Sequence, residues 1–218
     1  MTLHASMEIT SVCEKWSEGL SNLKDDIACV DYASRELANL LQNKELFVKI
    51  LDEVVQGGKY PDIRSASMFD NELLLYTDPS RQLSLRLFLW APGEYTVVHD
   101  HNSWGVIGPV SGVLEVLNYK REDDGAKEGY AKLANTKTLT CMPAETTFTL
   151  KLNEGIHNIG NPTNATMISL GMYGNPIRRG YINGFDPEKN SVYKIFPPKV
   201  KKRTLAKQAL SCQKGGRP

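Results

Sequence analysis

The chain has 218 residues, of which 41% are hydrophobic and 23% charged, a composition typical of a soluble globular protein with a sizeable core. Its net charge of +1 gives no strong field for nucleic acid or acidic lipid, and no apolar run reaches the ~20 residues of a membrane span. The first residues lack the basic-then-apolar pattern of a secretory signal. We therefore expect a cytoplasmic protein with no nucleic-acid or membrane partner, and its oligomeric state stays open.

The first sixty residues have helical character. Apolar residues recur with helical spacing within 34–42 and, more clearly, within 46–55. Gly57 and Gly58 then indicate the end of a helix. The pattern predicts an N-terminal helical region over residues 1–60.

After residue 70 the pattern changes to that of strands. Residues 83–90 alternate strictly, with four leucines on one face, which is typical of a strand with two different environments. Short apolar or β-branched runs follow, separated by turn residues, at 95–98, 104–110, 113–119, 138–141, 146–152 and 166–173. Many short strands at this spacing predict a sandwich or barrel over residues 70–175.

The remaining residues, 176–218, form a C-terminal extension of what we expect to be a single domain spanning residues 1–218. Residues 177–198 combine Gly and Pro with scattered aromatics and are expected to form loops with at most one hairpin. The basic stretch 199–207 is expected to be a solvated tail.

Three of the four histidines are candidate metal ligands. In an extended segment, His99 and His101 lie on the same face, because side chains alternate along a strand. His157 follows a turn much later, from which a returning strand can bring it opposite the pair. Three imidazoles suit Fe(II), Zn(II), Ni(II) or Cu(II) and leave coordination positions open for substrate and oxygen.

The residues around the first two histidines match a known motif. Gly93, five further residues, His99-x-His101 and then Gly112 resemble the first motif of the cupins. Gly105 stands where that motif has a glutamate. His157 followed by Asn161 resembles the end of the second cupin motif. The resemblance implies a mainly β fold, a cupin barrel (double-stranded β-helix, jelly-roll) with N-terminal α-helices.

Within the cupins, the chain resembles the thiol dioxygenases, the family of cysteine dioxygenase and the bacterial 3-mercaptopropionate dioxygenases. The similarity lies in the stretches VHDHNSWGVIGPVSG, GIHNIGNP and ISLGMYG. Without the motif's carboxylate, the charge at the site would be the +2 of the metal alone, which favours an anionic ligand such as a thiolate.

The resemblance implies that His99, His101 and His157 hold Fe(2+) and that a small thiol is oxidised with O2 to its sulfinic acid. The thiol would be 3-mercaptopropionate, cysteine or a related mercapto acid. Tyr173 takes the position of the family's catalytic tyrosine, whose hydroxyl can hydrogen-bond oxygen or substrate. The animal enzymes link this tyrosine to a cysteine, but that position is Gly105 here, so no such crosslink can form.

Two departures from the family concern proton transfer and the substrate anchor. The family's Ser-x-His-x-Tyr relay reads Ser169-x-Gly171-x-Tyr173 here, so only the two hydroxyls remain, and Ser169 is a candidate substrate contact. The family's arginine or glutamine on the early strand is missing from residues 70–76.

Other residues are therefore candidates for holding the substrate. Arg86 shares a strand face with Phe88, an apolar pocket position of the family, and an arginine there can clamp a carboxylate. If Glu72 faces inward, a cationic group on the substrate is favoured instead. Trp104, beside the segment that carries His101 (the metal loop), is a candidate for a residue in the wall of the pocket.

Two other functions stay open at this stage. A three-histidine cupin can also cleave carbon–carbon bonds of diketone-like substrates, and the same ligand set serves that reaction. The missing histidine at Gly171 also fits a non-catalytic protein that binds a metal and senses a small molecule.

Overall fold

The structure is a computed structural model that describes residues 5–56, 69, 71–197, 201, 203, 205 and 206. Within this part of the chain, three helices precede eleven strands and one 3-10 helix. The elements are α1 (Ala5–Ser21), α2 (Asp26–Leu41), α3 (Lys44–Val55), β1 (Glu72–Thr77), β2 (Leu83–Trp90), β3 (Val98–His99), β4 (Gly105–Ser111), β5 (Leu114–Arg121), β6 (Leu133–Cys141), β7 (Thr147–Thr149), η1 (Leu152–Gly155), β8 (Ile156–Gly160), β9 (Met167–Gly174), β10 (Ile182–Asp186) and β11 (Ser191–Ile195).

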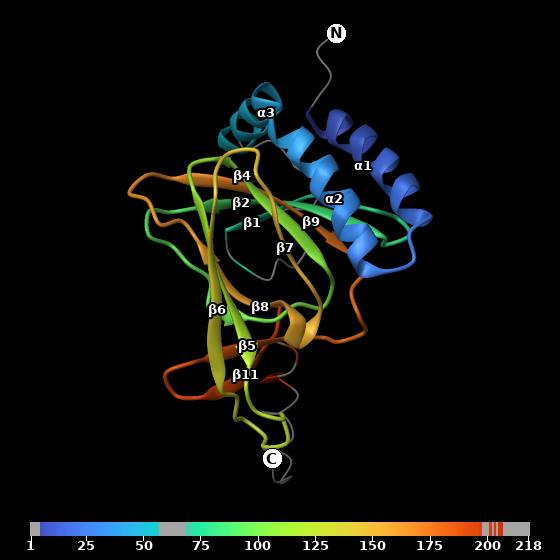
Figure 1. Ribbon diagram of the computed structural model, residues 1–218. Helices are drawn as coiled ribbons and strands as arrows, with labels where there is room; N and C mark the ends of the chain where they lie inside the picture. Colours follow the sequence, from blue (N-terminus) through green and yellow to red (C-terminus); the bar gives the residue numbers. More distant parts are fainter. Residues whose placement is uncertain are drawn as a thin grey trace.

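The strands form two antiparallel sheets that face each other (Figure 1). The five-stranded sheet has the order β1-β2-β9-β4-β7, and the six-stranded sheet has the order β11-β10-β3-β8-β5-β6. Neighbours within a sheet are mostly far apart in sequence, since the chain passes repeatedly from one sheet to the other. This is a jelly-roll, so the predicted mainly β barrel with N-terminal helices is confirmed.

The three helices cover the outer face of the five-stranded sheet (Figure 1). Asp25 caps α2 by accepting a hydrogen bond from the Ala28 amide, and Asn43 caps α3 through the Leu46 amide. The apolar stripes of the helices share one core with the outer residues of β1, β2, β4 and β9. The predicted stop at Gly57-Gly58 lies outside the described residues.

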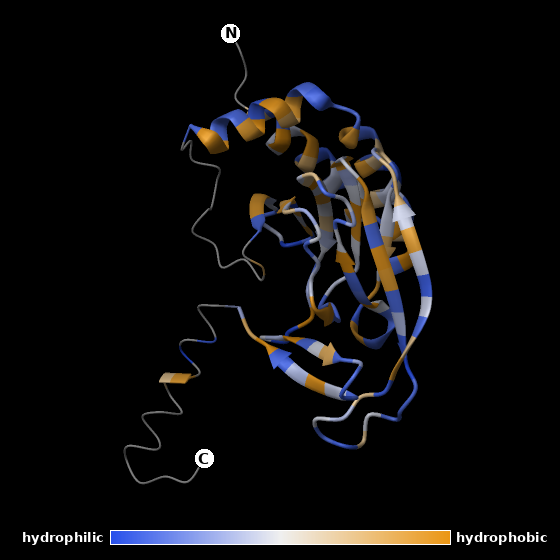
Figure 2. Ribbon diagram, turned by 90° about the vertical axis from the view of Figure 1, so that its left-hand side faces the viewer, coloured by the Kyte–Doolittle hydropathy of each residue, from blue (hydrophilic) through white to orange (hydrophobic). Residues whose placement is uncertain are grey.

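The two faces of strand β2 lie in different environments, as its alternation predicts. Leu85 and Leu87 pack under the helices, whereas Phe88 and Trp90 point into the barrel with Ile107. Figure 2 shows the resulting alternation of hydrophobic and hydrophilic residues along the strands. The five-stranded sheet therefore separates a helix-facing core from the interior of the barrel.

Residues 177–198, which are expected to form loops with at most one hairpin, contain one hairpin. This hairpin is part of the barrel wall. Strand β10 pairs with β11 and also with β3, with Gly184 opposite His99. The described part of the extension thus reaches the candidate metal ligands. In the basic stretch, Lys201, Arg203, Leu205 and Ala206 are described and exposed. The domain boundaries stay a prediction.

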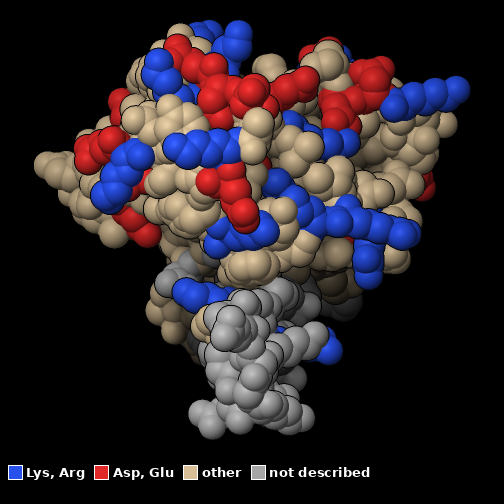
Figure 3. All heavy atoms as spheres, turned by 90° about the horizontal axis from the view of Figure 1, so that it is seen from below, with Lys and Arg blue, Asp and Glu red and all other residues tan. Residues whose placement is uncertain are grey.

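The surface carries both signs of charge. On the face seen in Figure 3, acidic and basic side chains are intermixed, in keeping with the net charge of +1. Among the described residues, no helix is long and apolar enough to cross a membrane.

Candidate metal centre

Two neighbouring strands of the six-stranded sheet bring the three histidines together. His99, at the end of β3, pairs in register with His157 on β8. His101 follows two residues after His99, beyond the end of the strand. Antiparallel partners lie side by side, so a local His-x-His pair and a distant histidine share one face.

The three imidazoles point toward a common centre. Their ring centroids are 4.7–4.9 Å apart, and one ligand nitrogen from each lies within 4.8 Å of the others. Nε2 of His101 is 2.9 Å from Nε2 of His157. Two nitrogens about 2.1 Å from one ion and about 90° apart would be about 3.0 Å from each other, so this separation fits two ligands of one ion.

The hydrogen bonding of the rings differs between His99 and His157. Nδ1 of His99 lies 2.8 Å from the carbonyl oxygen of Val97, a bond that places the proton on Nδ1 and leaves Nε2 free for a metal. Nδ1 of His157 is buried and has no hydrogen-bond partner among the described residues. The metal-facing nitrogen of this ring is instead Nε2, which lies opposite Nε2 of His101.

The histidines are neutral in the folded protein. Burial lowers the pKa of His99, and it lowers the pKa of His101 and His157 well below the ordinary value, with the neighbouring imidazoles adding to the effect. Neutral imidazole is the form that binds metal ions. The group can therefore hold a metal ion, whose identity these ligands alone do not determine.

Two glycines of the first motif turn the chain at the ends of strands. Gly93 has φ +70° and Gly112 has φ +78°, a region that disfavours every residue with a Cβ. A Cβ on Gly112 would also come within 3.0 Å of Met167. Motif glycines, jelly-roll topology and three converging histidines occur together. The fold is a cupin barrel.

Several solved structures resemble parts of this chain at low sequence identity. No family model matches the chain. Among solved structures, a cupin 2 domain-containing protein from Halorhodospira halophila shares 15% identity over 57% of this chain and 75% of its own, with a TM-score of 0.40. An RmlC-like cupin protein from Ralstonia eutropha shares 15% identity over 68% and 80%, with a TM-score of 0.35. The Cupin_2 domain of an XRE family transcriptional regulator from Enterobacter cloacae shares 16% over 49% and 96%, with a TM-score of 0.34.

A cavity of about 210 Å³ opens beside the histidines between the two sheets. Three predicted site residues of the five-stranded sheet, Arg86, Phe88 and Tyr173, line it. Its other walls include Ile107, Ile159, Pro176 and Ile182, so it is largely apolar with a few polar groups. This composition is typical of a small-molecule site.

Tyr173 lies in a slot made by two glycines. A Cβ on Gly105 would be 2.6 Å from the tyrosine ring, and a Cβ on Gly171 would be 2.8 Å from it. The ring lies nearly parallel to that of His101, with 6.2 Å between the centroids. Gly105 stands where the cupin motif has a glutamate, and Gly171 stands where the thiol dioxygenases have a histidine. Both glycines therefore make room for the Tyr173 ring.

Arg86 is paired within the cavity. It forms an ion pair with Glu72, whose side chain is only 2% exposed, and its Nε donates to the Ser84 hydroxyl at 3.2 Å. The guanidinium carbon lies 5.8 Å from the centre of the Tyr173 ring, within reach of a cation–π contact. Arg86 thus faces the cavity as predicted, and Glu72 faces inward as well.

Two predicted pocket residues lie elsewhere. The Ser169 hydroxyl is fully buried and does not line the cavity, but it accepts a hydrogen bond at 2.8 Å from Nε1 of Trp90, which does line it. Trp104 packs over Gly174 in the helix-facing core, because the glycine leaves room for the indole on that side. The expectation that Trp104 walls the pocket is therefore wrong, and Ser169 does not reach the cavity in this structure.

Sequence reasoning missed the residues that hold the metal loop. Asp100, between two candidate ligands, is completely buried and forms an ion pair with Arg179 at 2.6 Å. Asn102 also binds this arginine. The position of Asp100 inside the His-x-His motif was a signal that could have found it. Arg179 lies in a stretch expected to be loop, where nothing in the sequence singles it out.

Proposed function

We propose that this protein is a non-haem iron dioxygenase that oxidises a small thiol to its sulfinic acid with O2. The observation that carries this proposal is the ligand set of three neutral imidazoles, two of them buried, which no Asp, Glu or Cys of the described residues joins. Neutral ligands leave the charge of a divalent ion uncompensated, which favours an anionic substrate atom such as a thiolate. Ferrous iron, when bound, would supply the centre at which the thiol reacts with O2.

The Tyr173 slot supports the absence of a fourth protein ligand. The cupin motif places a carboxylate at the position of Gly105, and the tyrosine ring occupies the space beside that glycine. A larger side chain at position 105 would collide with the ring. The chain has thus exchanged a charged ligand for a neutral aromatic group next to His101.

Tyr173 would act as a hydrogen-bond donor in this site. Burial, together with the charge of Glu72, raises its pKa, while Arg86 opposes the shift. The hydroxyl therefore keeps its proton at neutral pH and can donate to an oxygen atom of the substrate or of O2. Phe88, Ile107 and Ile159 line the same cavity and limit the access of water.

The Glu72–Arg86 pair favours a substrate that carries both charges. A carboxylate alone would compete with Glu72 for the guanidinium. A substrate with a carboxylate and an ammonium group can bind Arg86 through the first and Glu72 through the second, so that each charge keeps an opposite partner. Among small mercapto acids, this argument favours an amino acid such as cysteine over 3-mercaptopropionate.

We also propose that the protein works in the cytoplasm, where thiols are kept reduced. Cell fractionation would test this location. Recovery of the protein outside the cytoplasmic fraction would argue against it.

The test is oxygen consumption by protein loaded anaerobically with Fe(II) and offered a panel of thiols. The reaction R–SH + O2 → R–SO2H adds both oxygen atoms to sulfur, so one O2 should be consumed for each sulfinate formed. His157→Ala, which removes one of the three imidazoles, is expected to abolish uptake. Folding of this variant is checked by circular dichroism.

Each outcome of this test distinguishes the competing functions. Stoichiometric sulfinate formation supports the proposal. Uptake with a diketone, but not with a thiol, would replace it with carbon–carbon cleavage. Tight binding of a small molecule without turnover would indicate a sensor.

A further inference from the structure

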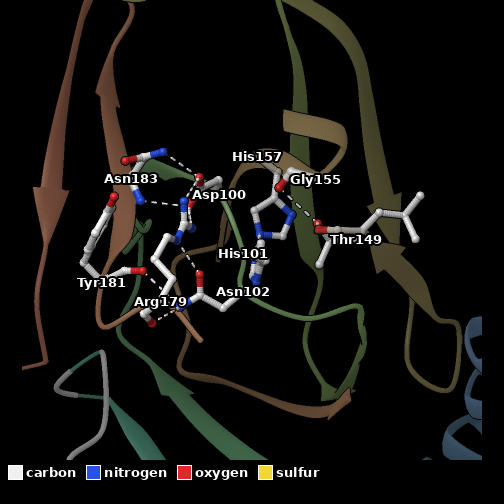
Figure 4. A network of polar contacts seen from close by, with 10 residues as sticks. Asp100, His101, Asn102, Thr149, Gly155, His157, Arg179, Tyr181 and Asn183 are labelled. Carbon is white, nitrogen blue, oxygen red and sulfur yellow. Dashed lines mark hydrogen bonds and ion pairs between the residues drawn. The ribbon is translucent and has the colours of Figure 1, made fainter. Parts of the chain in front are cut away.

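The loop that carries His101 is held by a polar network (Figure 4), one member of which, Asn102, also lines the cavity. Asp100 accepts hydrogen bonds from both terminal nitrogens of Arg179, at 2.6 and 3.0 Å. It also accepts from the backbone amide of Asn183 at 2.7 Å and from its side-chain amide at 2.8 Å. Both carboxylate oxygens are therefore used twice, as a completely buried carboxylate requires.

The same arginine also reaches the residue on the other side of His101. Nε of Arg179 donates to the side-chain oxygen of Asn102 at 2.6 Å. The side-chain amide of Asn102 in turn donates to the carbonyls of Arg179 and Tyr181, both at 3.0 Å. One guanidinium fork thus binds the two residues that flank His101.

His101 depends on this support more than its partners do. His99 lies in β3 and its ring is oriented by the carbonyl of Val97, and His157 lies in β8. His101 lies beyond the strand, and among the described residues its ring hydrogen-bonds only to the ring of His157. The direction of its ring is therefore set by the backbone on either side.

We propose that Arg179 is a positioning residue of the metal centre, which fixes the direction of the His101 ring by binding Asp100 and Asn102. The proposal concerns the metal site itself and holds for any reaction carried out there. Arginine suits the task because its planar fork can bind two groups at once, whereas lysine presents a single point charge. The residue comes from the segment between β9 and β10, outside both histidine motifs.

The chain contains a matched control for this interaction. Arg121 binds Asp123 through two nitrogens, each at 2.9 Å, and donates to the carbonyl of Tyr130 at 2.7 Å. Its side chain is 14% exposed, the same value as for Arg179. Arg121 does not line the cavity. The two arginines therefore differ mainly in the position of the aspartate that each one binds. Asp100 lies between two candidate metal ligands, and Asp123 does not.

The experiment compares Arg179→Met with Arg121→Met in the full chain. Co(II) and Fe(II) affinities are measured by competition with a chelator, the visible spectrum of the Co(II) form reports ligand geometry, and thermal unfolding reports stability. We expect both variants to lose stability. Only Arg179→Met should bind metal about 10- to 100-fold more weakly, with an altered Co(II) spectrum.

An unchanged affinity and spectrum in folded Arg179→Met would overturn the proposal. The same holds if Arg121→Met weakens metal binding equally, because the effect would then follow stability alone. If Arg179→Met does not fold, two variants replace it: Arg179→Lys, which keeps the charge, and Arg179→Met/Asp100→Asn, which leaves no unpaired charge. Unchanged metal binding in both would contradict the proposal, and weakened binding with an altered spectrum would support it.

Discussion

The two sheets of the barrel divide the candidate site between them. The six-stranded sheet carries His99 and His157, and β10 of that sheet follows the arginine that braces the metal loop. The five-stranded sheet carries Glu72, Arg86 and Tyr173, which line the cavity and which we propose to contact the substrate. Metal binding and substrate recognition therefore rest on separate layers, and changes in one layer should leave the function of the other intact.

The largest expected effect is on the six-stranded sheet and concerns metal-free protein. The pKa of each of the three histidines in the fold is lowered, chiefly by burial, below its value in the unfolded chain. Unfolding therefore takes up protons below about pH 6.5, and the free energy of unfolding falls as the pH falls.

Three such groups can lower the stability of metal-free protein by up to about 4 kcal/mol between about pH 7.5 and 5.5. Urea unfolding at the two pH values measures this loss. In His157→Ala the loss should shrink by up to about a third, because one titrating group is gone. An equal pH dependence in the two proteins would show that the histidines are not the cause.

The next effect tests the five-stranded sheet. Gly105→Ala places a methyl group against the Tyr173 ring, since a Cβ at position 105 would be only 2.6 Å from it. Displacing the ring by about 1 Å should lower kcat by roughly 100-fold. Metal affinity should be unchanged, because all three histidines lie outside this sheet.

Gly180→Ala is the matched control, since nothing lies within 4 Å of a Cβ there. It should keep both kcat and metal affinity. A Gly105→Ala protein that loses metal and activity together would show that the two layers are not independent.

A smaller effect is expected at the charged pair. Glu72→Gln removes the partner of Arg86 without changing the size of the side chain. Preference for cysteine over 3-mercaptopropionate, measured as the ratio of kcat/KM, should fall about tenfold, the equivalent of about 1.4 kcal/mol. Glu188→Gln, at an exposed position, should leave the ratio unchanged. A ratio that rises in Glu72→Gln would mean that Glu72 repels the amino acid rather than holding it.

The division of the candidate site between the two sheets also explains which parts of it the sequence could predict. The pair His99 and His101 follows from local spacing, because the His-x-His sequence and the motif glycines at nearby turns are constraints within a short segment. The alternation of β2 likewise predicted that its two faces lie in different environments. The Glu72–Arg86 pair depends on the register of β1 against β2, which shifts between Leu74 and Tyr76. The Arg179 network joins the segment before β10 to the metal loop, and no local pattern encodes either contact.

Trp104 illustrates the limit for a single side chain. It adjoins the metal loop in sequence, yet it packs toward the helices because Gly174, far along the chain, leaves space there. The periodicity of a strand tells which residues share a face. It does not tell which glycine opposite will admit a large ring.

The smallest expected effect separates packing from function at Ser169. Its hydroxyl does not line the cavity and accepts the indole hydrogen bond of Trp90, a residue that does line it. Ser169→Ala leaves that buried donor without a partner and should lower the free energy of unfolding by about 1–3 kcal/mol, measured in urea. The KM for the thiol should not change, because the hydroxyl does not face the cavity. An increased KM with unchanged stability would instead return Ser169 to the substrate site, and with it the hydroxyl pair that the sequence suggested.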